Sequence, residues 1–197
     1  MMNNEWKADR TETVAIYRNK NMESPPLRTI KEGDGFVVAE WGKLLVVGVY
    51  ASPRWPLERF EEMIWEIDTQ IREKQGAEQV TVIGDFNAKA ERWGPHRMNM
   101  RGKILLEWAT EKELHLINDA STSTFWRWRG ESVVDLIWAT PGLANRVKKC
   151  EVLVEAESLS SDHRYIVMEF TCKEMGCPYD GDGGAATFQI RTNHIRY

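Results

Sequence analysis

The sequence predicts an α/β fold of the mixed α+β kind, in which two layers of β-sheet form a sandwich flanked by helices. Two observations support this prediction. Most apolar runs come in pairs joined by short turns, as in hairpins, and two segments with apolar residues at helical spacing interrupt them. The 197 residues suffice for one domain with a sizeable core. The 42% hydrophobic and 28% charged shares are ordinary for a soluble globular protein.

The first half of the chain predicts four strands and one helix. Gly42-Lys43 joins two apolar runs and suits a type II′ turn, which predicts a hairpin. The helix begins near Pro56 and ends before Gly76, residues typical of these two positions. The expected elements are a strand at residues 13–17, hairpin strands at 36–41 and 44–50, a helix at 56–74 and a buried strand at 80–83.

The second half predicts one more helix, a second hairpin and two late strands. The hairpin turns at Arg129-Gly130-Glu131, and we expect Trp126 on its first strand to pack on the core. Residues 173–197 contain a Gly-rich run and predict a flexible tail or linker. The expected elements are a helix at 102–112, a short strand at 116–117, hairpin strands at 124–128 and 132–139, and strands at 147–154 and 165–170.

The sequence contains no recognisable signal peptide or membrane span, and this predicts an intracellular protein. The N-terminal residues are polar and do not resemble a signal peptide. No apolar run reaches the roughly 20 residues of a membrane span. We therefore expect a nuclear or cytoplasmic protein that is not secreted and does not engage a membrane. Cys150, Cys172 and Cys177 lack a matching Cys/His pair, so reduced structural thiols are more probable than a zinc site.

Polar residues with catalytic potential follow or precede buried strands at two places. Asp85 and Asn87 come directly after the run at 80–83, and Asp162-His163 precedes the strand at 165–170. Carboxylates can hold a hard cation, and an imidazole can move a proton. These residue types therefore suit metal-assisted hydrolysis of phosphate esters. A simple Asx turn at Asp85 is an equally good interpretation of that segment alone.

Two further residues extend this candidate site. Asp135 is a single acid inside an apolar strand, and an unpaired buried carboxylate is costly. It therefore lies either at a wet strand edge or beside a partner, for which His163 is the favoured candidate. Tyr50 ends an apolar strand, where its phenol would reach a phosphate or simply cover the end of the sheet.

Basic residues gather near this candidate site although the net charge is −4. A local basic rim is what phosphate binding needs, although a solvated loop that is basic by chance remains an alternative. The alternating Trp126-Arg127-Trp128-Arg129 lies at the tip of the second hairpin. The expected nucleic-acid contacts include Arg97, Arg101, Arg127 and Arg129, and the basic stretch comprises Lys89, Arg92, His96, Arg97, Arg101 and Lys103.

The candidate site residues belong to four segments that follow one another along the chain. These are Val49-Tyr50-Ala51-Ser52-Pro53, Gly84-Asp85-Phe86-Asn87-Ala88, Ser132-Val133-Val134-Asp135-Leu136-Ile137 and Ser161-Asp162-His163. In this order they resemble the endonuclease/exonuclease/phosphatase superfamily, which has a DNase I-like fold. Within it, residues 12–170 are similar to the endonuclease domain of arthropod non-LTR retrotransposons. The closer signs are Asn87-Ala88-Lys89 running to Trp93-Gly94, Arg101-Gly102 before a helix, and Thr124-Phe125 before the strand with Asp135.

The resemblance implies hydrolysis of a DNA phosphodiester with Mg²⁺, or Mn²⁺ in its place. The nick leaves a 3′ hydroxyl that primes reverse transcription, and in a full-length element a reverse transcriptase domain follows. The resemblance also implies a role for each site residue. His163 activates water and is oriented by Asp135, Asp85 and Asn87 bind the phosphate or its metal, Asp162 lies beside the metal, and Tyr50 contacts phosphate. The hairpin with Arg127 and Arg129 is similar to one that enters a DNA groove.

The N-terminal segment departs from the family pattern. The family opens with a strand that carries an Asn and a strand that ends in a metal-binding Glu, whereas Glu5 and Glu12 lack that context. We therefore expect residues 1–172 to form the domain without its first two strands, followed by the tail. Two alternatives stay open: a phosphomonoesterase of the same fold, and an inactive remnant that binds nucleic acid at most.

Overall fold

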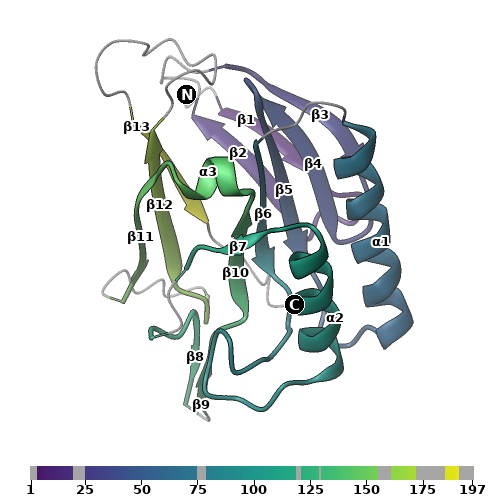
Figure 1. The fold of residues 1–197 in the computed structure, drawn as a ribbon, viewed down its shortest axis with the longest axis vertical. Helices are drawn as coiled ribbons and strands as arrows, with labels where there is room; N and C mark the ends of the chain where they lie inside the picture. The colour runs from purple at the N-terminus through teal and green to yellow at the C-terminus, as the bar shows by residue number, and fades with distance from the viewer. Residues whose placement is uncertain are drawn as a thin grey trace.

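A six-stranded mixed sheet forms the centre of the molecule (Figure 1). The computed structural model describes residues 4–19, 25–74, 79–118, 121–128, 130–154, 161–171 and 185–190. Strands β5 and β6 run parallel, and the other neighbours in this sheet are antiparallel. In spatial order the strands are β3 (Leu27–Glu32), β4 (Phe36–Trp41), β5 (Leu44–Tyr50), β6 (Gln79–Asp85), β10 (Asp135–Ala139) and β7 (His115–Leu116).

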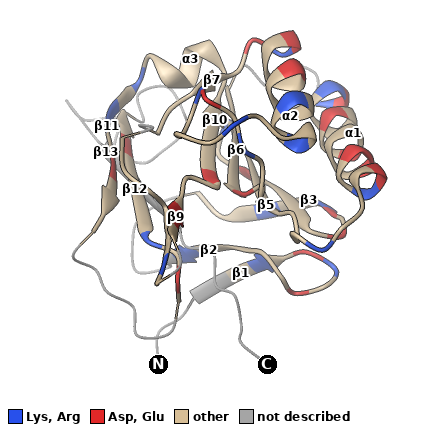
Figure 2. Ribbon diagram, turned by 90° about the horizontal axis from the view of Figure 1, so that it is seen from below, with Lys and Arg blue, Asp and Glu red and all other residues tan. Residues whose placement is uncertain are grey.

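Two helices cover one face of this sheet (Figure 2). They are α1 (Leu57–Glu73) and α2 (Met100–Glu111), and a short α3 (Pro141–Ala144) follows β10. Apolar side chains of both long helices, among them Phe60 and Leu105, form one core with the facing side chains of the sheet. Among the described residues, no helix combines the length and apolar character that crossing a membrane requires.

Further strands cover the opposite face and complete the second layer. They are the antiparallel sheet β11 (Val147–Leu153), β12 (Tyr165–Thr171) and β13 (Ala185–Ile190), and the hairpin of β1 (Asn4–Ala8) and β2 (Ala15–Asn19). Ile166, Met168 and Phe170 of β12 form a second core with the central sheet. A separate hairpin, β8 (Phe125–Arg127) with β9 (Gly130–Ser132), projects at the lower end in Figure 1.

The sequence of β5 shows why its strand lies at the centre. Six of its seven residues are buried, because helices cover one face and the second layer covers the other. A strand buried on both faces is expected to be continuously apolar. Its hairpin with β4 confirms the prediction for residues 36–50, and Gly42 has the positive φ of 58° that a primed turn requires.

Several predicted elements need correction. Strands β1 and β3 were not expected from the sequence. The predicted strand at 132–139 is two strands, because β9 pairs with β8 whereas β10 pairs with β6 and β7. The tail expected at 173–197 contains β13, whose backbone pairs with β12. Residues 172–184 and 191–197, which include the Gly-rich run, Cys172 and Cys177, lie outside the described residues.

Candidate active site

Strand register places three of the expected site residues side by side. Asp85 at the end of β6 pairs with Tyr50 of β5 on one side and with Asp135 of β10 on the other. Both side chains are at most 3% exposed. Two neighbouring buried carboxylates repel each other unless hydrogen bonds, a proton or a cation compensates their charge. This row of strand ends therefore suits a site that binds a cation.

His163 supplies part of that compensation. It lies just before β12 in the second layer, and its Nδ1 is 2.8 Å from Oδ2 of Asp135. Its other nitrogen, Nε2, lies 3.9 Å from Oδ2 of Asp85. The expectation that Asp135 has His163 as its partner is confirmed. Because Asp135 engages Nδ1, the imidazole orientation is fixed and Nε2 faces the second carboxylate.

Asn87 orients Asp85. Its backbone N–H donates to Oδ1 of Asp85 at 2.8 Å and its Nδ2 donates to Oδ2 at 2.8 Å. Nδ2 also donates to the carbonyl of Ala51 at 3.0 Å. The two side-chain N–H groups are thus engaged within the protein. The side-chain atom of Asn87 that remains for a ligand is the carbonyl oxygen.

The backbone leaves the extended conformation at the end of β6. Asn87 has φ of 45°, a left-handed conformation that Asn tolerates better than most residues. Gly84 has φ of 147°, and a Cβ at that position would lie 1.9 Å from the carbonyl oxygen of Val49. Gly84 therefore permits the close approach of β6 to β5, and Asn87 turns the chain out of the sheet.

Burial and neighbouring charges shift the pKa values of His163 and Tyr50. Burial by itself would lower the pKa of His163, but the hydrogen bond with Asp135 and the charges of Asp135, Asp85 and Asp162 outweigh it and raise the pKa above its usual value. Burial, together with the charge of Asp85, raises the pKa of Tyr50. The Tyr50 phenol therefore keeps its proton near neutral pH and can donate it in a hydrogen bond.

An open cleft of about 500 Å³ lies over these residues. Tyr50, Asn87 and His163 line its floor, while Arg54, Lys89 and Arg127 contribute cationic side chains. The size suits a small ligand or a segment of a larger one. A cleft that combines a polar floor with three cations is suited to a phosphate group.

The predicted nucleic-acid contacts divide into different environments. Arg97 is exposed on the segment between β6 and α2. Arg127 lines the cleft, and its Nε donates to Oδ2 of Asp162 at 2.6 Å. Arg129 lies outside the described residues. The sequence predicts that Trp126 packs on the core. This prediction is wrong, since Trp126 is 57% exposed.

Arg101, another predicted nucleic-acid contact, lies in a buried position. It is only 8% exposed and does not belong to the exposed rim. Its Nη2 donates to the carbonyls of Ser52 at 2.9 Å and Trp55 at 2.7 Å. The guanidinium therefore binds the loop between β5 and α1, which forms one wall of the cleft.

The adjacent residues bind the opposite wall. Asn99 caps α2 by accepting from Gly102 N at 2.7 Å, and the same oxygen accepts from Lys89 N at 3.0 Å. A Cβ on Gly102 would lie 1.9 Å from the carbonyl oxygen of Lys89. We call Asn99, Arg101 and Gly102 the α2 bracket, since they join both loops of the cleft. From the sequence, Arg101 is expected to contact nucleic acid and Arg101-Gly102 is a sign of the family resemblance, but neither pattern predicts that these residues join the two loops.

Asp85, Asp135 and His163 also form a candidate metal cluster. Each offers one ligand atom, and these atoms lie within 4.8 Å of one another. Mg²⁺ prefers oxygen ligands and is often bound by one or two carboxylates together with water and substrate phosphate. The two buried carboxylates fit that ion. The imidazole suits it less well and is already engaged with Asp135. Asp162, the other predicted ligand, pairs with Arg127.

Comparison with known proteins identifies the family. A family model described as endonuclease-reverse transcriptase matches residues 44–167, a range that holds Tyr50, Asp85, Asp135 and His163. The chain belongs to the endonuclease-reverse transcriptase family. This is a family of the endonuclease/exonuclease/phosphatase superfamily and is close to the endonucleases of non-LTR retrotransposons. No curated protein is significantly similar to this family member in sequence.

Solved structures share the fold of this endonuclease-reverse transcriptase family member. The endonuclease domain of TRAS1, a telomere-specific non-LTR retrotransposon, is 24% identical with a TM-score of 0.67, covering 85% of this chain and 77% of that chain. The 3′-5′ exonuclease NExo from Neisseria meningitidis is 19% identical with a TM-score of 0.57. A structure of the Neisseria 3′ phosphatase NExo with a product DNA hairpin is 19% identical with a TM-score of 0.58. Both NExo matches cover 85% of this chain and 79% of the other.

Proposed function

We propose that this chain is a Mg²⁺-dependent endonuclease that nicks DNA, as the nuclease domain of a non-LTR retrotransposon. The row of Tyr50, Asp85 and Asp135 across three strand ends, with His163 bonded to Asp135, carries the proposal. The family description supports a further proposal that a reverse transcriptase domain follows in a full-length protein. Action on nuclear DNA would require that the protein reach the nucleus.

In the proposed mechanism, His163 is the general base. Asp135 binds Nδ1, so Nε2 is the atom that takes a proton from the attacking water. The negative charge of Asp135 stabilises the imidazolium that results. Nε2 lies 3.9 Å from Oδ2 of Asp85, and the His163 residue itself lines the cleft in which the phosphate would bind.

The remaining groups bind the substrate and the cation. Asp85, held by Asn87, and the neighbouring Asp135 would hold Mg²⁺ with the substrate phosphate. The bound ion would supply Lewis-acid stabilisation of the charge that develops on the phosphate oxygens. Tyr50 donates a hydrogen bond to a phosphate oxygen, and Lys89 and Arg127 position the neighbouring phosphates.

A plasmid-relaxation assay tests this function. We expect supercoiled plasmid to become open circles with Mg²⁺, and EDTA to prevent the reaction. His163→Ala should slow nicking by at least about 100-fold, the usual contribution of a general base. His115→Ala is the matched control, because His115 is exposed on β7 and outside the site.

Assays of the unchanged protein and of His163→Ala also distinguish an endonuclease from a phosphatase and from an inactive remnant. Release of phosphate from a 3′-phosphorylated oligonucleotide without plasmid nicking would replace the endonuclease proposal by a phosphatase. DNA binding without either reaction would favour the inactive remnant. Nicking that persists unchanged in His163→Ala would show that the assigned base is incorrect.

A further inference from the structure

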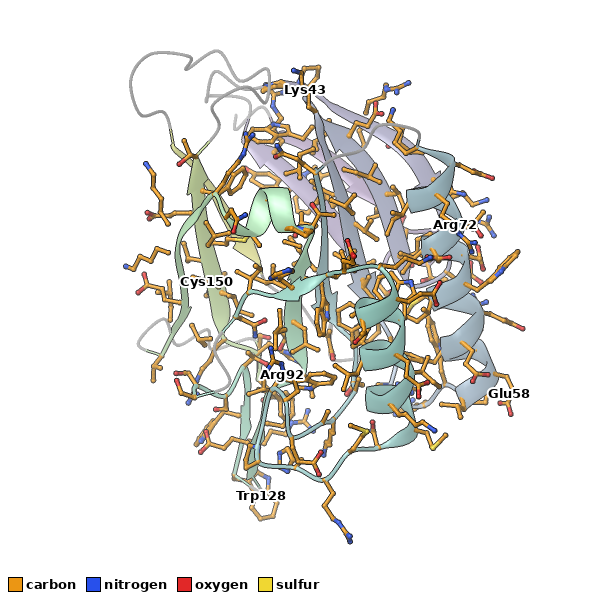
Figure 3. All side chains as sticks on the ribbon, viewed as in Figure 1. Lys43, Glu58, Arg72, Arg92, Trp128 and Cys150 are labelled. Atoms are coloured by element: carbon orange, nitrogen blue, oxygen red, sulfur yellow. The ribbon has the colours of Figure 1, made fainter. Side chains whose placement is uncertain are left out.

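Two tryptophans on the β8–β9 hairpin are exposed beside the cleft. Trp126 is 57% exposed and Trp128 is 78% exposed. An indole buries a large apolar area when it finds a partner and is among the residues most enriched at binding surfaces. Figure 3 shows Trp128 at the lower tip of the molecule, where it projects away from the rest of the chain. The sequence predicts that Trp126 packs on the core, but core packing explains the position of neither exposed ring.

The strand that carries these rings is fixed to the candidate active site. The backbone N–H of Trp126 donates to the carbonyl of Asp162 at 2.9 Å, and Nε of Arg127 donates to its carboxylate at 2.6 Å. The ring of Phe125 meets the imidazole of His163 edge-on, with 5.0 Å between centroids. These contacts define the position of β8 relative to the proposed general base, and Trp128 follows directly after this strand.

The exposed rings are also continuous with the cleft. Trp126, Arg127, Trp128 and Asp162 line a concavity of about 520 Å³. Arg127 lines both this concavity and the cleft. A strand whose phosphate lies over His163 would place its neighbouring nucleotides along the hairpin. The guanidinium of Arg127 is suited to their phosphates, and the indoles are suited to flat apolar rings.

A nucleobase is the chemical group that fits both features. Bases stack on aromatic side chains, while the attached phosphates need cations nearby. In an intact duplex both faces of an internal base already stack on neighbouring bases. An indole can therefore take a base face only where the strand is unpaired or opened.

We propose that Trp126 and Trp128 form a stacking platform for unpaired bases next to the scissile phosphate. This inference rests on the proposed action on DNA and specifies its substrate class. The platform makes an opened or single-stranded segment beside the cut site the preferred ligand. Rigid attachment through Asp162 then couples base capture to placement of the phosphate over His163.

Binding to fluorescein-labelled oligonucleotides in EDTA tests the platform without catalysis. The probes are oligo(dT), a strand of equal length with consecutive abasic sites, and the matched duplex. We expect oligo(dT) to bind at least about five-fold more tightly than the abasic strand, since stacking contributes about 1–3 kcal/mol per base. Trp126→Ala and Trp128→Ala should each weaken oligo(dT) binding by about five- to a hundred-fold and leave abasic binding unchanged.

Two controls keep the result interpretable. Trp65→Ala removes a ring that is 65% exposed on α1, outside the cleft, and should bind oligo(dT) as the unchanged protein does. Trp126→Phe retains an aromatic face and should recover most of the affinity. Unaltered thermal melting of each variant establishes that the fold is intact.

Results that contradict the stacking platform can be told apart from results that contradict the proposed function. Equal affinity for oligo(dT) and the abasic strand would overturn the platform while leaving plasmid nicking, and so the proposed function, untouched. Equal losses for Trp65→Ala and Trp126→Ala would also overturn it. Failure of every probe to bind, together with no nicking, would instead refute the proposed function.

Discussion

Individual buried carboxylates form the centre of the candidate active site. Asp85 and Asp135 lie opposite each other at adjacent strand ends, and each is stabilised by a different neighbour. Asn87 donates to Asp85, whereas His163 contacts Asp135. Because each acid has its own compensating group, the pair can remain buried behind Asn87 and His163, which line the cleft.

Asp9 is a third buried carboxylate, remote in sequence from the site. It accepts hydrogen bonds from the backbone N–H groups of Thr11, Thr13 and Val14, and at 2.9 Å from that of Gly35. It therefore joins the β1–β2 hairpin to the turn between β3 and β4. Burial alone would raise the pKa of Asp9, but the hydrogen bonds outweigh it and lower the pKa below 3.8.

This arrangement predicts a pH-dependent loss of stability in Asp9→Asn. At pH 7 the variant should unfold with about 1–3 kcal/mol less free energy, the usual cost of disrupting a buried hydrogen-bonded group. A lowered native pKa means that the contribution of ionised Asp9 is present above the unfolded pKa and is lost as pH falls through the native pKa. Urea unfolding at pH 7 and pH 3 should show a difference that shrinks with acid. A constant difference would contradict the role of the ionised carboxylate.

At the scale of elements, the N-terminus of α2 organises the cleft. The α2 bracket binds the loop after β5 through Arg101 and the loop after β6 through Asn99. Arg101 also lies over the ring of Phe60 at 5.2 Å, which fixes its guanidinium between α1 and α2. Both walls of the cleft therefore depend on one helix end.

The bracket predicts that Arg101→Lys impairs catalysis more than DNA binding. A lysine lacks the planar guanidinium whose Nη2 donates to both carbonyls and whose face lies over the ring of Phe60, so the loop with Ser52 would shift. Displacement of reacting groups by about 1 Å can cost about 100-fold in rate. We expect nicking at saturating DNA to fall about ten- to a hundred-fold, while affinity in EDTA changes less than about three-fold.

Lys103→Ala is the matched control for this prediction, because Lys103 is exposed on the same helix. Its nicking rate should equal that of the unchanged protein. A parallel loss of rate and affinity in Arg101→Lys would indicate general damage to the fold, and an unchanged rate would show that the bracket does not position the cleft.

The sequence reveals contacts that follow from local rules and misses those made by distant chain segments. Asp135 was assigned a partner because an acid in an apolar strand needs one, and that argument was correct. Arg101 binds carbonyls 46 and 49 positions away, and Asp9 binds an N–H 26 positions away. No periodicity encodes such contacts. The exposure of Trp126 was also missed, because residue type favours burial while the short β8–β9 hairpin leaves its ring at the surface.

At the scale of the whole molecule, the cationic side chains that line the cleft contrast with a negative net charge. The net charge is −4, and α1 carries both signs (Figure 2), with ion pairs such as Arg59–Glu62. Long-range attraction to DNA is therefore weak. We therefore expect DNA binding to depend mainly on the cations that line the cleft, namely Arg54, Lys89 and Arg127.

This distribution predicts a shallow salt dependence of duplex binding. Neutralising about three phosphates corresponds to a slope of about −3 in a plot of log affinity against log salt concentration. Fluorescence anisotropy between about 50 and 200 mM salt measures that slope. Lys89→Ala should reduce its magnitude by about one. Lys43→Ala should not, because Lys43 lies at the end of the molecule opposite Trp128 (Figure 3). Equal changes in both variants would mean that DNA binds to dispersed surface charge rather than to the cleft.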